Sequence, residues 1–182
     1  ARYNKVINTL NQAPKAAEKI PGCFLLKAQS YWRLKKRVRA YAVLVKGRLV
    51  HPTANAMLRL QALLLIELKL SREGYKKAQA YIKVYRAVLA KQKAAPTNAP
   101  PLKNKKKKSN PLLDVYLMYA GAFARARLFK KAQLLLEEAR MVAPQHVDVL
   151  VQLARVYLED KRVRTAASIL ERAAYYKPKL MI

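Results

Sequence analysis

Apolar residues in the last seventy positions recur with the spacing of amphipathic helices. The first pair of predicted helices carries Val115, Tyr116, Tyr119 and Phe123, then Ala132, Leu135, Leu136 and Ala139. The same residue classes return 34 positions later, at Val149, Leu150, Leu153 and Tyr157, then at Ala166, Ile169, Leu170 and Ala173. Pro144 and Pro178 each follow a second helix, because proline cannot continue the helical hydrogen bonds. The pattern predicts two helix–turn–helix repeats, at 113–146 and 147–180, of the kind that stack into solenoids.

These positions resemble the tetratricopeptide repeat (TPR) family. Large apolar residues stand at the fourth, seventh and eleventh places of each repeat, and alanine stands at the eighth, twentieth and twenty-seventh. Leucine at the twenty-fourth place and proline at the thirty-second complete the match. The resemblance implies an all-α, TPR-like superhelix of about four helix–turn–helix units, whose surface holds another molecule.

Two weaker copies precede this region. The first, at about 21–54, has Ala28, Tyr31, Ala40 and Leu44 in the expected places, with Gly47 where the second alanine would stand. The second has a longer first helix over about 54–71, with roughly an extra turn. We expect residues 71–74 to supply its turn and 74–91 to form its second helix, with Tyr85 at a position that favours alanine.

Composition then divides the chain into four parts. Residues 1–20 are expected to form a helical extension broken near Pro14, and 21–91 hold the basic, degenerate repeats. Residues 92–111 are rich in proline and lysine and predict a linker. Residues 112–182 contain the two well-formed repeats.

The charge of the chain is its most unusual property. Lys and Arg number 38 against 10 Asp and Glu, a formal net charge of +28. Residues 1–110 hold 26 of these cations and only three acidic residues, whereas 111–182 hold 12 cations and seven acidic residues. Such an excess favours a polyanionic partner, with nucleic acid ahead of an anionic membrane surface.

Candidate RNA contacts lie on the predicted second helices of the two basic repeats, on the turns before them and on the linker. They are Arg33, Lys35, Lys36, Arg37, Arg39, Lys46, Arg48, Lys76, Lys77, Lys83, Arg86, Lys103, Lys105, Lys106, Lys107 and Lys108, with Trp32 as a further candidate. The lysine run at 103–108 is also compatible with a nuclear-import signal. Tyr31 stands where the repeat places a core aromatic residue, and we expect it to pack. Trp32 suits either the core or stacking on an unpaired base.

Candidate protein contacts lie on the expected concave face of the two well-formed repeats. They are Asp114, Leu117, Met118, Val151, Gln152 and Arg155. Many TPR domains bind acidic peptide tails through a Lys and Asn clamp on this face. Here acidic residues replace that set, which argues against this mode of binding.

Nothing in the sequence predicts catalysis, a small-molecule substrate, a cofactor or a metal site. His51, His146 and the single Cys23 are far apart in the sequence, and no phosphate-binding loop or nucleophile motif occurs. One cysteine excludes an internal disulfide. No apolar run reaches the roughly 20 residues of a membrane-spanning helix.

The sequence therefore favours a non-enzymatic, structural RNA-binding protein of a large ribonucleoprotein. Its N-terminal half would contact rRNA or another structured RNA, and its C-terminal repeats would contact neighbouring proteins. The resemblance and the missing initiator Met point to a mitochondrial ribosome in the matrix, after removal of a targeting segment. The alternative is a TPR adaptor or scaffold in a membrane-associated or nucleolar complex, with a nuclear, nucleolar or cytoplasmic location.

Overall fold

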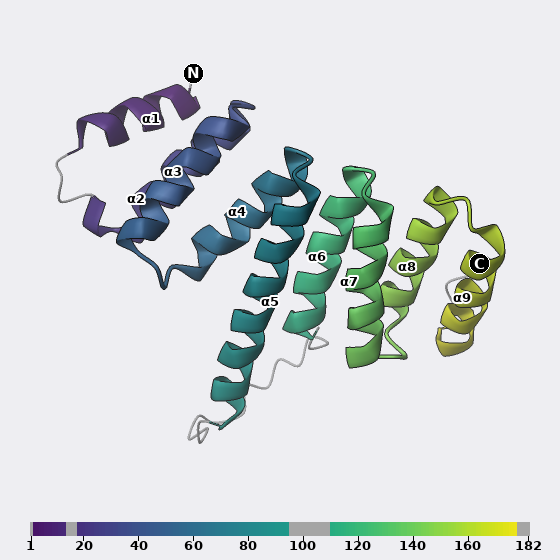
Figure 1. The fold of residues 1–182 in the computed structure, drawn as a ribbon. Helices are drawn as coiled ribbons and strands as arrows, with labels where there is room; N and C mark the ends of the chain where they lie inside the picture. The colour runs from purple at the N-terminus through teal and green to yellow at the C-terminus, as the bar shows by residue number, and fades with distance from the viewer. Residues whose placement is uncertain (1, 14–17, 95–109, 178–182) are drawn as a thin grey trace. The chain divides into compact units, whose positions relative to one another are not determined.

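The computed structural model describes residues 2–13, 18–94 and 110–177, and their regular secondary structure is helical throughout (Figure 1). The helices are α1 Arg2–Gln12, α2 Pro21–Arg33, α3 Arg37–Val50, α4 Asn55–Glu67, α5 Ser71–Ala94, α6 Pro111–Arg125, α7 Phe129–Val142, α8 Val147–Glu159 and α9 Val163–Tyr176. The all-α prediction is confirmed. The chain forms two compact units, residues 1–81 and 82–182, and the division falls within α5. Most of the expected linker, 95–109, lies outside the described residues, as does Pro14.

In the first unit, α1 packs on α2, α2 on α3 and α3 on α4. The core between α2, α3 and α4 is a cluster of Phe24, Ala28, Ala40, Leu44, Met57, Leu60 and Leu64. Gly47 of α3 is buried in this cluster, where a Cβ atom would lie 2.8 Å from Phe24 Cγ and 2.9 Å from Met57 Sδ. The repeat pattern places alanine at this position, but the packing leaves room only for glycine.

The turns between the helices of each pair share one conformation. Lys35, Lys69, Arg127 and Lys161 have φ angles of 59°, 60°, 59° and 62°. At each, two backbone hydrogen bonds close the preceding helix, as when Lys35 N–H bonds to Trp32 O and Lys36 N–H to Tyr31 O. Lys35 and Lys69 are 34 residues apart, as are Arg127 and Lys161, so the degenerate repeats keep the period of the well-formed ones.

The second degenerate repeat differs from its prediction in two ways. Helix α4 has 13 residues, the same as α2, so it carries no extra turn. Ser71–Gly74 is the first turn of α5 rather than a loop, and the turn lies at Lys69. Gly74 is buried, and a Cβ atom there would lie 3.2 Å from the backbone nitrogen of Ile66. This glycine allows two helices to approach closely, which the sequence pattern did not distinguish from a turn signal.

In the second unit, α6 packs on α7, α7 on α8 and α8 on α9, with a further contact between α6 and α8 (Figure 1). Most of the predicted apolar positions form its core, in which Tyr116, Tyr119, Phe123, Leu135, Leu136 and Leu150 are almost completely buried. Val115 is half-buried and Leu170 is exposed, contrary to the prediction. The side chain of Asn110 accepts a hydrogen bond from Leu112 N–H and caps α6, and Pro111 occupies its first position.

No helix among the described residues combines the length and the hydropathy needed to cross a membrane.

Candidate functional site

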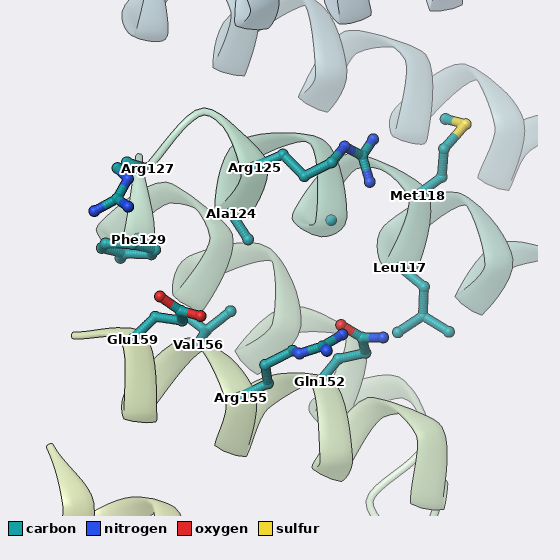
Figure 2. Close-up of a pocket in the computed structure, with 11 residues that line it drawn as sticks. Leu117, Met118, Ala124, Arg125, Arg127, Phe129, Gln152, Arg155, Val156 and Glu159 are labelled. Carbon is teal, nitrogen blue, oxygen red and sulfur yellow. The ribbon is translucent and has the colours of Figure 1, made fainter. Parts of the chain in front are cut away.

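A groove of about 610 Å³ lies in the second unit and is lined mainly by α6 and α8 (Figure 2). Its lining residues are Leu117, Met118, Gly121, Ala124, Arg125, Arg127, Phe129, Gln152, Arg155, Val156 and Glu159. Helical spacing explains the set: 118, 121 and 125 share one face of α6, and 152, 155, 156 and 159 share one face of α8. The groove therefore lies between the first helices of two successive repeats.

The groove combines an apolar surface with an excess of positive charge. Leu117, Met118, Phe129 and Val156 supply apolar side chains. Three arginines line it against one carboxylate, Glu159, and Figure 2 shows the side chains of Arg125 and Arg155 extending along it. Such a lining suits an extended segment that carries both apolar and acidic side chains.

Four of the six predicted protein contacts lie in this groove: Leu117, Met118, Gln152 and Arg155. Asp114 and Val151 are on the same helices but are not among its lining residues. The sequence analysis did not name the other seven lining residues, which are Gly121, Ala124, Arg125, Arg127, Phe129, Val156 and Glu159. Extending the helical spacing by one or two turns from the predicted positions finds five of these, whereas Arg127 lies in the turn after α6 and Phe129 is the first residue of α7.

Tyrosine hydroxyls bonded to two adjacent glutamates of α7 hold the walls of the groove in place. Tyr157 of α8 donates to Glu137 Oε1 at 3.3 Å, and it accepts from Gln133 Nε2 at 2.7 Å. Tyr116 of α6 donates to Glu138 Oε2 at 3.2 Å. Burial raises the pKa of both tyrosines above 10.0, and the neighbouring carboxylates raise it further. Both hydroxyls therefore stay protonated donors at neutral pH.

The predicted basic stripe on α3 is divided between two faces. Residues 37 and 48 are eleven positions apart and share one face, whereas residues 39 and 46 share another, rotated by about 200° on a 100°-per-residue helix. Arg37 and Arg48 are half-buried, while Arg39 and Lys46 are exposed. A single ligand strand cannot contact all four along one line.

Acidic residues distant in sequence pair with two of these cations. Arg37 Nε bonds to Glu67 Oε2 at 2.7 Å, and Lys46 Nζ bonds to Glu18 Oε1 at 2.7 Å. Both pairs are partly exposed, so each contributes little to stability. They reduce the free positive charge of α3.

Trp32 lies at a second pocket, in the first unit. Gln29, Trp32 and Arg33 of α2 and Glu67 at the end of α4 line this pocket, which has a volume of about 540 Å³. Trp32 Nε1–H donates to Glu67 Oε2 at 2.8 Å. Tyr31 and Trp32 are both half-buried and pack against the core cluster of α2–α4. Tyr31 thus packs as predicted, and Trp32 combines packing with access to a pocket.

The other predicted RNA contacts are placed as follows. Arg33, Lys35 and Lys36 are exposed at the turn between α2 and α3, and Lys76 and Lys83 are exposed on one face of α5; Lys77 is half-buried there. Arg86 Nη2 bonds to the Tyr116 hydroxyl, and its guanidinium lies 5.6 Å from the centre of that ring. Arg86 is therefore engaged within the second unit. The lysines at 103 and 105–108 lie outside the described residues.

The two histidines flank helices, and the cysteine lies within one. His51 follows α3, and its Nε2 lies 2.8 Å from Glu18 O, while His146 precedes α8. Cys23 is a free thiol on α2. Within the described ranges, no group of three or more His, Cys, Asp or Glu side chains could hold a metal ion.

Comparison with known proteins bears on the repeats and the fold. Residues 114–180 match the tetratricopeptide repeat family. MamA from Desulfovibrio magneticus RS-1, solved from residue 41 to the end, is 12% identical, with a TM-score of 0.63 over 99% of this chain and 88% of that chain. MamA of AMB-1 is 14% identical, with a TM-score of 0.61 over 98% of this chain and 91% of that chain. The C-terminal part of a TPR repeat-containing protein from Cytophaga hutchinsonii is 16% identical, with a TM-score of 0.62 over 97% and 60%.

These likenesses show a TPR-type helical-repeat fold, while the family match itself covers residues 114–180, the two C-terminal repeats. Comparison with curated protein sequences gave no match.

Proposed function

We propose that this protein is a non-enzymatic adaptor whose α6–α8 groove binds an extended segment of a partner protein. The observation that carries this proposal is the lining of the groove, where apolar side chains adjoin three arginines and one glutamate. The preferred segment carries an apolar side chain against Leu117 and Val156 and an acidic side chain near Arg125 or Arg155. This mode differs from the Lys and Asn clamp, whose residues the concave face lacks.

Selection from a displayed peptide library, followed by fluorescence polarisation with the enriched peptides, tests the adaptor function. We expect enriched peptides to combine apolar and acidic residues. Leu117→Asp and Arg155→Ala should each weaken their binding at least fivefold. Leu134→Asp is the matched control, because Leu134 is exposed on α7 outside the groove. Equal binding to the Leu117→Asp variant would exclude the groove as the site.

A second function, RNA binding by the first unit, is favoured by its charge. Residues 1–81 hold seventeen Lys and Arg against three acidic residues, a net charge of +14. Binding to single-stranded RNA through about eight phosphates should give a log–log dependence of affinity on salt with a slope of about −5 to −7. A slope near zero would exclude this function while leaving the adaptor function intact.

The assembly that would use both functions is a large ribonucleoprotein, and we keep the mitochondrial ribosome as the first proposal. A chain that combines a basic surface for RNA with repeats for a neighbouring protein suits a structural subunit of such a particle. Imaging of the tagged full-length protein tests the location. Mitochondrial signal that co-sediments with ribosomal subunits supports the proposal, and nucleolar or membrane-associated signal supports the scaffold alternative.

A further inference from the structure

We propose that the Trp32 pocket of the first unit is a binding site for one unpaired nucleobase, with a preference for bases that carry an exocyclic amino group. This proposal rests on the RNA-binding function proposed above and specifies where and how a base is held. Among the described residues, Gln29, Trp32, Arg33 and Glu67 line the site.

The indole ring is already positioned for stacking. Trp32 packs on the core cluster and lines the pocket, and its Nε1–H bond to Glu67 fixes the orientation of the ring. A ring that is ordered before binding loses little conformational entropy when a base stacks on it. Stacking on an aromatic side chain contributes substantially to single-strand binding and is tolerant of base identity.

Glu67 supplies the selectivity. Trp32 and Arg37 both bond to Oε2, which leaves Oε1 as the carboxylate oxygen that neither of them occupies. A carboxylate only accepts hydrogen bonds, so it favours the amino group of cytosine or adenine. Uracil has a carbonyl at the corresponding position and would place an acceptor against this carboxylate.

The surrounding cations suit the phosphate groups. Residues 29, 32 and 33 share one face of α2, which places Arg33 beside the ring, and Lys35 and Lys36 follow at the adjoining turn. A nucleotide offers a planar face, an amino donor and a phosphate within one unit. A peptide would need several residues to do the same, and a basic peptide would be repelled by this unit.

The test is the binding of the full-length protein to fluorescein-labelled C8, A8 and U8 RNA, measured at several salt concentrations. C8 and U8 are the decisive pair, because both are pyrimidines with the same charge. We expect C8 to bind about tenfold more tightly than U8, as expected for one hydrogen bond to a charged group. Trp32→Ala should weaken C8 binding by roughly five- to 100-fold.

Two further variants test whether the base preference comes from Glu67 and whether Arg33 acts through its position rather than through its charge alone. Glu67→Gln replaces an acceptor by an amide that both accepts and donates, so the preference for C8 over U8 should fall below threefold while melting temperature changes little. Arg33→Ala should weaken binding more than Arg72→Ala, which removes the same charge from α5 outside the pocket.

Three results would overturn the proposal. Equal affinity for C8 and U8, with a steep salt slope and no effect of Trp32→Ala, would retain RNA binding and exclude the pocket. Absence of binding to any of the three oligonucleotides would exclude both the RNA function and the pocket. If the Trp32→Ala variant no longer bound the library-selected peptides but bound RNA as before, the pocket would be a peptide site instead. A folded Trp32→Phe variant that keeps partial affinity would support stacking.

Discussion

Tyr116 contributes both to the hydrophobic core and to hydrogen bonds between helices. Its ring is almost completely buried, and its hydroxyl bonds to Glu138 and Arg86 from two other helices. The sequence identified the ring as a core position from its place in the repeat. It could not identify the polar partners, since Arg86 is 30 residues away across the linker.

The raised pKa of Tyr116 predicts a loss of stability at alkaline pH. Its folded-state pKa lies above the unfolded value of 10.0, so its contribution is complete below pH 10 and is lost as pH rises through the folded pKa. Tyr116→Phe should lower the free energy of unfolding by about 1 kcal/mol at pH 8, through lost hydrogen bonds. Urea denaturation from pH 8 to 11.5 should show this difference shrinking above pH 10. Tyr175→Phe, at an exposed ring, should follow the wild-type curve.

Gly47 gives a prediction opposite to that of the family pattern. Alanine is the usual residue at this place of the repeat, which suggests that Gly47→Ala would stabilise the helix. The added Cβ would instead overlap Phe24 and Met57, and such overpacking costs about 1–3 kcal/mol.

The matched control is Gly22→Ala, because the nearest atom to a Cβ at position 22 is 3.9 Å away. This change should stabilise the protein by up to about 1 kcal/mol through reduced backbone entropy. Thermal denaturation followed by circular dichroism distinguishes the two. Equal shifts of both variants in the same direction would contradict the packing argument.

At the scale of elements, the turns were the hardest feature to predict. Pairs of helices follow from apolar spacing, and Gly or Asn would ordinarily mark the left-handed residue that closes the first helix. Here Lys or Arg occupies that position in all four described turns, so no Gly or Asn in the sequence marks where the first helix ends. Gly74 was then mistaken for the turn residue, although it allows α5 to approach Ile66. Backbone conformation and close approach both favour glycine, and one sequence does not separate them.

The turn between α8 and α9 therefore offers a stabilising substitution. Lys161 is exposed with a φ of 62°, a conformation that costs a residue with a Cβ atom about 1–2 kcal/mol. Lys161→Gly should raise the free energy of unfolding by about 1 kcal/mol, after allowance for the greater freedom of glycine in the unfolded chain. Arg172→Gly, in the middle of α9, should lower it by a similar amount. Denaturant unfolding of both variants measures the difference, and a destabilised Lys161→Gly protein would refute it.

At the scale of the whole molecule, the sequence predicted the helical-repeat class and the lopsided charge but not how the charges pair. Glu67 and Glu18 are two of the three acidic residues before position 110, and each forms an ion pair with a cation about 30 positions away in the sequence. These pairs form only when the helices stack, so no local pattern reveals them. Most of the other cations among the described residues are exposed to solvent, which leaves a large excess of positive charge.

That excess predicts a protein stabilised by salt. With a net charge of +28, repulsion among exposed cations opposes folding, and its range falls from about 30 Å at 0.01 M salt to about 3 Å at 1 M. The melting temperature should therefore rise by several degrees between 0.02 and 0.5 M NaCl, and choline chloride should act alike because ionic strength is the cause. The double variant Arg39→Glu/Lys76→Glu changes two exposed cations and lowers the net charge by four, so its melting temperature should depend less on salt. An equal dependence in the variant, or a wild-type protein that melts earlier in salt, would show that charge repulsion does not limit this fold.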